Sequence, residues 1–338
     1  MQTPLLPPKL KKNDTIAYFS PSSPATVFAP RRYERALVYL KGKGFKLKAG
    51  SLTGKSDFYR SGTIKERANE LNQLIRDPDV KCIISTIGGM NSNSILPYID
   101  YQSLLKDPKI ICGYSDMTAI LLAIYAKTGL ITFYGPALIA SFGEFSPLVD
   151  ETYKSFDSLL CKANKPPYTY AVPHYWTDQR LNWETQNKAK ELFSNHIEFR
   201  GEGIISGRLI GGNLNTMTAL WDSPYMPEVK TGDILFLEDG LKDISTMERL
   251  FSFLKINGTF NKIAAIVLGK HECFDDLKTK RRPLEVLNEV LDDINMPMVI
   301  DWDASHTHPM LTMPLGLKVS LDFKKQKIQI EEPWVLDN

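Results

Sequence analysis

The chain has 338 residues, which is enough for two ordinary domains of roughly 100 to 200 residues each. Its 43% hydrophobic and 24% charged residues are typical of globular proteins and exclude a disordered or fibrous chain. The 41 basic and 39 acidic residues are scattered along the sequence and give a net charge of +2. No nucleic acid and no membrane surface is therefore expected as a partner, and a small molecule or peptide is favoured.

The sequence also bears on location and redox state. The N-terminal segment MQTPLLPPKLKKND has no apolar run of signal-peptide length, and nowhere do about 18 apolar residues follow one another as in a membrane span. We therefore expect a cytoplasmic protein. Its cysteines lack the paired short spacing of a zinc site, so we expect reduced, mostly buried thiols and no metal or other cofactor; they are Cys82, Cys112, Cys161 and Cys273.

The first half of the chain alternates short apolar runs with helical patterns. Near-continuous apolar runs suit a parallel sheet, and they predict strands at 15–20, 45–47, 80–87, 110–113 and 131–134. Amphipathic stripes between them predict helices on Tyr33, Ala36, Leu37 and Leu40 and on Ile64, Ala68, Leu71 and Ile75. With a last helix from about Glu151 to Ala163, residues 1–165 are predicted to form a doubly wound α/β domain.

A connection and a second domain are predicted after this helix. Residues 166–200 start with a Pro-Pro pair and are polar and aromatic-rich with little periodicity, which is typical of an interdomain segment. Residues 201–338 contain strand-like runs at 204–209, 234–237, 263–268, 298–302, 319–323 and 328–330. Two helical patterns, one from Ile244 to Leu254 and one after Pro283, complete a smaller α+β domain of undetermined strand order.

Ser115 lies where an apolar strand passes into a helical pattern, in Gly113-Tyr114-Ser115-Asp116. A serine at such a turn is exposed at the carboxyl edge of the sheet. The amides that follow, beginning with that of Asp116, point from a helix N-terminus that can stabilise an oxyanion. This is the physics of a nucleophile elbow, although the sequence is not G-x-S-x-G. Taken alone, the segment favours the commoner role of Ser115 as a helix N-cap.

A second glycine turn, Gly88-Gly89-Met90, follows the predicted strand at 80–87. Glycines let backbone approach a ligand closely, so an amide near Gly89 is a candidate second oxyanion donor. A phosphate-binding loop is the rival interpretation, but neither G-x-x-x-x-G-K-[ST] nor G-x-G-x-x-G occurs here. Met90 also stands where a nucleotide kinase would be expected to have an acidic residue, which weakens that function.

The second half of the chain offers a carboxylate and two histidines after predicted strands. Glu238 ends the apolar run at 234–237, and His306 and His308 follow the run at 298–302. An orienting carboxylate and a histidine base are what a serine needs to become nucleophilic at neutral pH. Taken singly, a Glu after a strand is usually a solvated turn residue, and a loop histidine is usually structural. Sequence spacing cannot show whether these residues meet.

The whole chain resembles the LD-carboxypeptidase family of serine peptidases, and most closely its branch of microcin C self-immunity proteins. The similar segments are spread from end to end, at 14–16, 20–24, 87–93, 113–116, 211–215, 235–239 and 306–309. The resemblance implies a flavodoxin-like N-terminal domain, a swivelling-type C-terminal domain and a homodimer.

Carried over residue by residue, the resemblance implies Ser115 as nucleophile, Glu238 as carboxylate and His306 as base. The amides of Gly89 and Asp116 would form the oxyanion hole. The resemblance favours His306 over His308 as the base, although Ser305 precedes His306 where the family usually has Gly. The implied substrate-binding residues are Trp183, Asn213, Asn215 and Lys242. Trp183 could stack a nucleobase and Lys242 could reach a phosphate; the alternatives are a core tryptophan and a solvated lysine.

The expected function is therefore hydrolysis of an amide bond through an acyl-enzyme, without a metal. The expected substrate is a small peptide or a peptidyl nucleotide. The sequence favours the aspartyl amide of processed microcin C or a similar aminoacyl nucleotide. The alternative substrate is a muropeptide, from which a terminal D-alanine would be removed. A non-catalytic, two-lobed protein that binds small ligands, with Ser115 only as a helix cap, is the alternative from another class.

Overall fold

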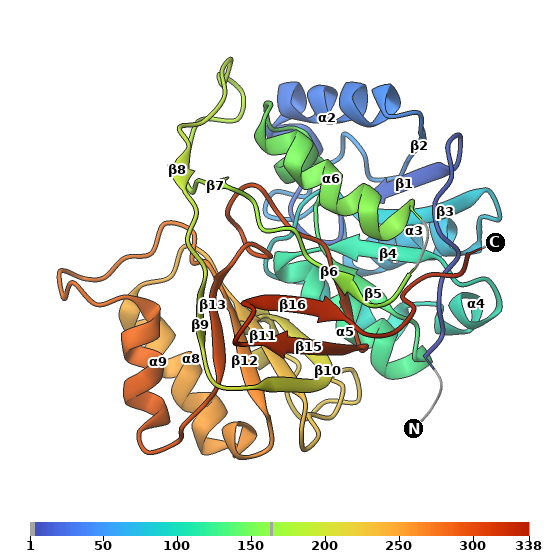
Figure 1. Cartoon of the computed structure of the whole chain (residues 1–338). Helices are drawn as coiled ribbons and strands as arrows, with labels where there is room; N and C mark the ends of the chain where they lie inside the picture. Colours follow the sequence, from blue (N-terminus) through green and yellow to red (C-terminus); the bar gives the residue numbers. More distant parts are fainter. Residues whose placement is uncertain (1–3, 163–164, 338) are drawn as a thin grey trace.

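The computed structural model describes residues 4–162 and 165–337 (Figure 1). Two large sheets, one of six strands and one of eight, organise this part of the chain. Figure 1 shows the first sheet among the blue and green helices and the second among the yellow to red elements. None of the helices in the described ranges has the length and apolarity that crossing a bilayer would require.

The first sheet contains the strands that the apolar runs predict. They run parallel and are β1 (Thr15–Phe19), β2 (Lys46–Ala49), β3 (Val80–Ser85), β4 (Ile110–Gly113) and β5 (Thr132–Tyr134). Their ends differ from the predicted ones by at most two residues. One strand was not predicted: β14 (Met313–Leu315) comes from the far end of the chain and pairs antiparallel with β5. The order is β14-β5-β4-β3-β1-β2.

The helices of the first half are α1 (Ala25–Phe28), α2 (Pro30–Gly42), α3 (Ile64–Arg76), α4 (Tyr101–Lys106), α5 (Thr118–Thr128) and α6 (Leu148–Leu160). Local sequence explains their starts: Pro30 is the first residue of α2, and Thr63 and Glu66 form a capping box at α3. The helix predicted at 151–163 begins three residues earlier, directly after Pro147. Its expected end at Ala163 lies outside the described residues.

Helix α5 is the element that follows Ser115, and it lies between the two sheets. It touches β4 and β5 of the first sheet, and also β10 (Ile204–Asn213) and α7 (Leu214–Thr218) of the second half. Residues 118–124 are all buried, so the helix has no polar face. A helix packed in this way fixes the position of the residues at its N-terminus.

The second sheet is mixed. Besides β10, its strands are β6 (Tyr168–Thr169), β9 (Glu198–Arg200), β11 (Ile234–Glu238), β12 (Ala265–Gly269), β13 (Met298–Trp302), β15 (Lys318–Asp322) and β16 (Lys327–Ile330), in the order β6-β16-β15-β10-β11-β12-β13-β9. β10 to β13 run parallel. β10 is longer than predicted, because its first half pairs antiparallel with β15 and its second half, from Leu209 to Asn213, pairs with β11.

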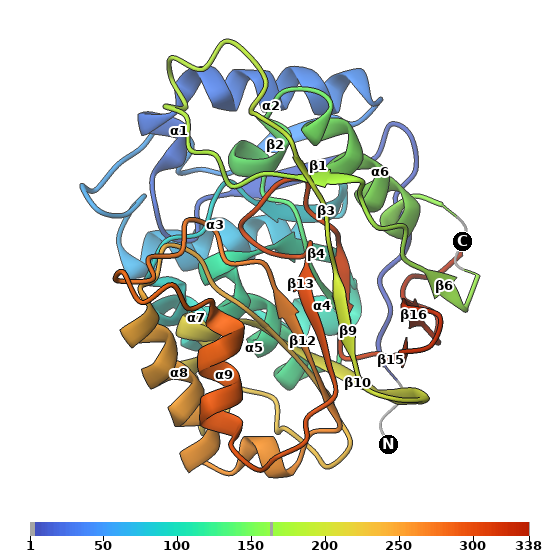
Figure 2. The ribbon, with the colours of Figure 1, turned by 60° about the vertical axis from the view of Figure 1, so that its left-hand side comes forward.

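The segment predicted as an irregular connection has more structure than expected. Besides β6 and β9, which join the second sheet, it contains a small ribbon of β7 (Tyr175–Trp176) and β8 (Phe193–Ser194). Residues 177–192, which we term the strap, loop over α1 and α2 (Figure 2). A contact supports this placement, because the amide of Arg31 in α2 donates to Glu184 of the strap. The domain division at 165 and 200 stays a prediction.

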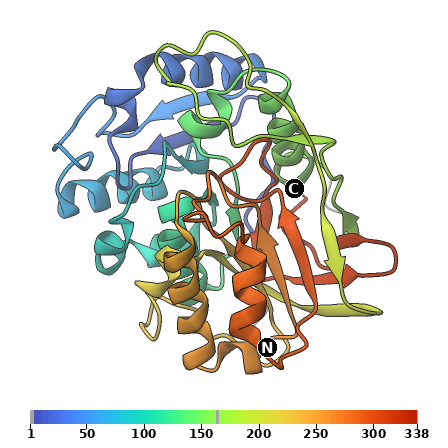
Figure 3. The ribbon, with the colours of Figure 1, turned by 90° about the vertical axis from the view of Figure 1, so that its left-hand side faces the viewer.

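Helices α8 (Ile244–Ile256) and α9 (Pro283–Leu291) lie side by side against the second sheet (Figure 3). Asp243 caps α8 by accepting from the amide of Thr246. The structure also has 3₁₀ helices at η1 (Ser92–Tyr98), η2 (Ser115–Met117) and η4 (Thr259–Asn261), and a π-helical turn at η3 (Leu138–Phe142). Cys82 and Cys112 are buried free thiols, whereas Cys161 and Cys273 are free and only partly buried.

A buried charge cluster holds the strap on the first half of the molecule. Arg32 of α2 and Glu144 form an ion pair of 2.8 Å with no exposed side-chain surface, and Lys190 of the strap lies 3.5 Å from the same carboxylate. Gln186 of the strap accepts from Arg32 at 2.7 Å and donates to Glu144. Burial raises the pKa of Glu144, but Arg32 and Lys190 more than offset this, so the pKa lies below its ordinary value.

Removing the charge of Glu144 should therefore destabilise the protein. Glu144→Gln leaves two buried cations without an anion, and breaking a buried pair in this way costs about 3–5 kcal/mol. The free energy of unfolding, measured by denaturant titration, should fall by that amount. Glu151→Gln is the matched control, because the pair of Glu151 with Lys154 is partly exposed and such pairs contribute about 1 kcal/mol or less. Equal losses in both variants would contradict the role given to the cluster.

Candidate active site

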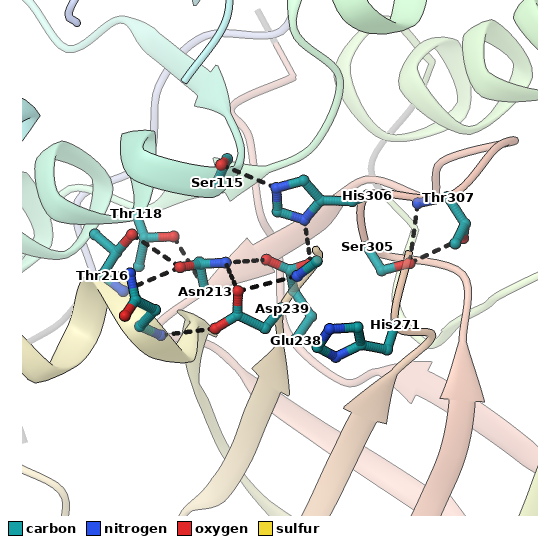
Figure 4. Close-up of polar contacts among 12 residues, drawn as sticks. Ser115, Thr118, Asn213, Thr216, Glu238, Asp239, His271, Ser305, His306 and Thr307 are labelled. Carbon is teal, nitrogen blue, oxygen red and sulfur yellow. Dashed lines mark hydrogen bonds and ion pairs between the residues drawn. The ribbon is translucent and has the colours of Figure 1, made fainter. Parts of the chain in front are cut away.

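The carboxyl ends of strands from both sheets meet at one place, and Ser115, His306 and Glu238 lie there (Figure 4). Ser115 follows β4, Glu238 ends β11, and His306 lies in the loop after β13. Nε2 of His306 lies 2.9 Å from Oγ of Ser115, and Nδ1 of His306 lies 2.6 Å from Oε2 of Glu238. The three side chains thus form one hydrogen-bonded line across the two halves of the chain.

Ser115 has a strained backbone. Its φ is +62°, in the left-handed region that non-glycine residues seldom occupy, and such strain costs roughly 1–3 kcal/mol. Its side chain is not a helix cap: neither η2 nor α5 has a side-chain cap at its N-terminus, and the hydroxyl is directed at His306 instead. The capping role that the local sequence favoured is therefore wrong.

Electrostatics couple His306 to Glu238. Burial alone would lower the pKa of His306, but the adjacent Glu238 carboxylate raises it to about 9. Burial alone would raise the pKa of Glu238, but His306 and the hydrogen-bond donors around the carboxylate lower it. The pair therefore favours a charged carboxylate, and it stabilises a proton on the imidazole.

Glu238 has two further partners, one from each half of the chain. Its Oε1 accepts from the hydroxyl of Tyr134, at 2.5 Å, and from Nδ2 of Asn213, at 3.0 Å. Asn213 also donates to the buried carboxylate of Asp239 and, through its own Oδ1, caps α7 by accepting from Thr216 (Figure 4). The structure thus turns the side chain of Asn213 toward Glu238, whereas the family resemblance implies a contact with the substrate.

The Gly88-Gly89 turn lies directly against Ser115. A Cβ added at Gly88 would lie 2.8 Å from Cβ of Ser115 and 3.1 Å from the amide nitrogen of Asp116, so only glycine fits. Gly89 has a φ of +147°. The side chain of Asp116 points away, because it accepts from the amide and hydroxyl of Ser92. The two backbone segments expected as oxyanion donors are therefore neighbours of the serine hydroxyl.

A cavity of about 570 Å³ opens onto Ser115 and His306, a size suited to a small-molecule ligand. Trp183 of the strap forms part of its wall and is only partly buried. Arg32 lies over the Trp183 ring, 4.7 Å from its centroid, and the Phe28 ring stacks beside it with centroids 6.4 Å apart. Trp183 is thus a wall of the cavity rather than a core residue.

Two expected ligand contacts, Asn215 and Lys242, are near the triad but do not line this cavity. Asn215 lies in the first turn of α7, and its backbone amide donates to the carboxylate of Asp239. The side-chain ammonium of Lys242 lies 3.7 Å from the carboxylate of Asp239. The backbone amide of Lys242 donates to Nε2 of His271. Burial lowers the pKa of His271 to about 4, so this histidine is neutral and can accept. Leu241, next to Lys242, does line the cavity.

Sequence reasoning missed several charged or polar residues of the cavity wall. Lys190, Arg180 and Glu272 line it, and burial raises the pKa of Glu272. His308 also faces it, but lies outside the line from Ser115 to Glu238, and its Nδ1 has no hydrogen-bond partner among the described residues. Burial lowers the pKa of His308 well below its ordinary value, so it is neutral. Lys190 and Arg180 lie in the strap, where no periodic pattern indicated a site.

Within residues 4–162 and 165–337, no three His, Cys, Asp or Glu side chains lie together as a metal ion would require. Ser115, His306 and Glu238 are instead hydrogen-bonded to one another.

Comparison with known proteins gives consistent matches along the chain. The model of the LD-carboxypeptidase N-terminal domain matches residues 16–135, and that of the C-terminal domain matches residues 206–321. The microcin C7 self-immunity protein MccF of Escherichia coli is 56% identical over 334 residues, which cover 98% of this chain and 97% of MccF. The murein tetrapeptide carboxypeptidase of Pseudomonas aeruginosa is 24% identical, over 89% of this chain and 91% of that enzyme.

Solved structures agree with these matches. MccF in complex with aspartyl sulfamoyl adenosine, and MccF in complex with glutamyl sulfamoyl guanosine, each align with a TM-score of 0.97. Both are 56% identical and cover 98% of this chain and 100% of the MccF chain.

The environment of His306 can be tested without a substrate. At pH 7.5 we expect a proton on both nitrogens of His306, because its pKa is raised to about 9, whereas His271, with a pKa lowered to about 4, should be neutral. Glu238→Gln should lower the pKa of His306, since burial then acts without the carboxylate. NMR titration of labelled histidine, with His306→Ala to assign the signal, measures both effects. A pKa of His306 below its ordinary 6.5 in the parent protein would contradict this account.

Proposed function

Because the chain belongs to the LD-carboxypeptidase family of serine peptidases, we propose that it hydrolyses an amide bond through an acyl-enzyme formed on Ser115. The family and the fold class predicted from the sequence are thereby confirmed. The observation that carries the proposal is the line of hydrogen bonds from Oγ of Ser115 through His306 to Glu238. A binding protein that used Ser115 only as a cap would have no need of this line.

The reactive form is the fraction of enzyme in which His306 is neutral, and this fraction grows as the pH rises toward the raised pKa of about 9. In this form, Nε2 of His306 takes the hydroxyl proton while Oγ of Ser115 attacks the amide carbonyl. The amides of Gly89 and Asp116 would stabilise the resulting oxyanion. His306 then gives its proton to the departing amine, which leaves an ester on Ser115. Water hydrolyses this ester by the same steps, with His306 first as base and then as acid. Glu238 holds the imidazole and stabilises its charged form throughout.

The proposed substrate is an aspartyl amide of a nucleotide, such as processed microcin C or a related aminoacyl nucleotide. The structures of MccF with aspartyl and glutamyl sulfamoyl nucleosides support this choice, because MccF is 56% identical over nearly the whole chain. Trp183 supports it further, since an aromatic ring on the cavity wall can stack a nucleobase. A muropeptide ending in D-alanine is the alternative substrate, in line with the murein tetrapeptide carboxypeptidase.

The remaining substrate-binding residues, the location and the oligomeric state complete the proposal. We place Lys242 at the phosphate or phosphate-like linker, which would need Lys242 to turn from Asp239 toward the cavity. From the family resemblance, we also place Asn215 in contact with the substrate. We assign Asn213 to the support of Glu238 in addition to any contact with substrate. We also propose a cytoplasmic homodimer.

The identity of the nucleophile and base can be tested by substitution. Ser115→Ala or His306→Ala should lower kcat on an aspartyl adenylate amide about 10⁴-fold or more, with folding intact, because the line of proton transfer is broken. His308→Ala should have a much smaller effect, since His308 is not hydrogen-bonded to Ser115. Steady-state kinetics measures both. If His308→Ala abolishes activity and His306→Ala does not, the assignment is wrong.

Substrate choice can be tested at Trp183. Stacking a base on an aromatic ring contributes about 1–3 kcal/mol, so Trp183→Ala should lower kcat/KM for an aspartyl adenylate amide roughly 5- to 150-fold. An L-Lys-D-Ala muropeptide should be affected little, and Trp183→Phe, which keeps an aromatic face, should retain most activity on the nucleotide substrate. If the parent enzyme prefers the muropeptide and both substrates lose equally, Trp183 only shapes the cavity and the enzyme acts on cell-wall peptides.

A further inference from the structure

The hydroxyl of Tyr134 contacts two members of the proposed triad at once. It donates to Oε1 of Glu238, at 2.5 Å, and it accepts from the backbone amide of Ser115, at 3.1 Å. Tyr134 is the last residue of β5 in the first sheet, whereas Glu238 ends β11 in the second sheet. The phenol is therefore a second link between nucleophile and carboxylate, separate from the one through His306.

The directions of both hydrogen bonds follow from chemistry. An amide N–H can only donate, so the phenol oxygen must accept from Ser115, and its single proton is left for Glu238. Tyr134 has no exposed surface, and burial next to the Glu238 charge raises its pKa well above the ordinary value, so it keeps that proton. A buried carboxylate needs such donors, because an unpaired buried charge is costly.

We propose that Tyr134 is a positioning residue that holds the strained backbone of Ser115 and tunes the basicity of His306 through Glu238. Two consequences follow from the contacts. The bond to the Ser115 amide favours the left-handed conformation that directs Oγ at His306. The bond to Oε1 withdraws negative charge from Glu238, which weakens the stabilisation of protonated His306.

A purely structural role is the alternative, since Tyr134 also packs its ring edge-on against Phe236 and Tyr114. The two roles differ in what they predict for His306. Packing depends on the ring, which phenylalanine keeps, whereas charge withdrawal depends on the hydroxyl. The other titratable groups near His306 stay the same in such a substitution; they are Glu272, Asp239, Lys190, His271, His308 and Tyr114.

Tyr134→Phe should therefore change both catalysis and titration. We expect kcat to fall about 10- to 100-fold with KM changed less than about 3-fold, because the nucleophile is less well held but the cavity is intact. The pKa of His306 should rise by about 0.5–1 unit, since a hydrogen bond of about 1 kcal/mol no longer withdraws charge from Glu238. Kinetics and NMR titration of His306 measure the two effects.

Tyr170→Phe is the matched control. Tyr170 is also a buried tyrosine, and its hydroxyl donates to the carbonyl oxygen of Thr312 rather than to the triad. This variant should lose similar stability but leave the pKa of His306 unchanged. If Tyr134→Phe moves kcat and the His306 titration no more than Tyr170→Phe does, the proposal is overturned.

A second variant tests the proposal even if Tyr134→Phe fails to fold. 3-Fluorotyrosine at position 134 keeps the ring and the hydroxyl but makes the phenol a stronger donor, so the pKa of His306 should fall rather than rise. An unchanged or raised pKa in this variant would contradict the proposal even if Tyr134→Phe did not fold. Because the titration needs no substrate, it remains informative if the proposed nucleotide substrate is wrong.

Discussion

The buried carboxylate of Glu238 is the group on which the rest of the site depends. A fully buried charge is stable only when partners surround it. The partners of Glu238 come from three separate parts of the chain: His306 from the loop after β13, Tyr134 from β5 and Asn213 from β10. β5 lies in the first sheet, whereas β10 and β11 lie in the second. The buried carboxylate of Glu238 therefore has all its partners only when the two halves of the chain pack together, and the same packing assembles the site.

On the substrate side of the site, buried charges also hold an irregular segment in place. The strap that carries Trp183 has no helix or strand in its central part. A backbone bridge from Thr177 to His308 holds its first residue, and the cluster of Arg32, Glu144 and Lys190 holds its far part. The guanidinium of Arg32 also lies over the Trp183 ring. Arg32 thus connects the stability of the strap to the wall of the cavity that Trp183 forms.

The sequence predicted much of the fold but less of the site. Apolar runs located β1 to β5 well, because parallel strands buried between helices leave a strong local signal. They missed β14, a strand of three residues that contains Pro314 and pairs with residues 132–134, far away in the sequence. The turns at Ser115, Gly89 and Glu238 were visible as strand ends, but their meeting was implied only by family resemblance. The roles of Tyr134 and Lys190 arise from docking between distant segments, which no local pattern encodes.

The central claim is that Ser115 forms a covalent acyl intermediate. The most direct measurement is mass spectrometry of the enzyme quenched in acid during turnover of an aspartyl adenylate amide, followed by digestion. We expect a peptide containing Ser115 that is heavier by one aspartyl residue and is absent from Ser115→Ala. Steady hydrolysis without any such adduct, or an adduct on another residue, would contradict it.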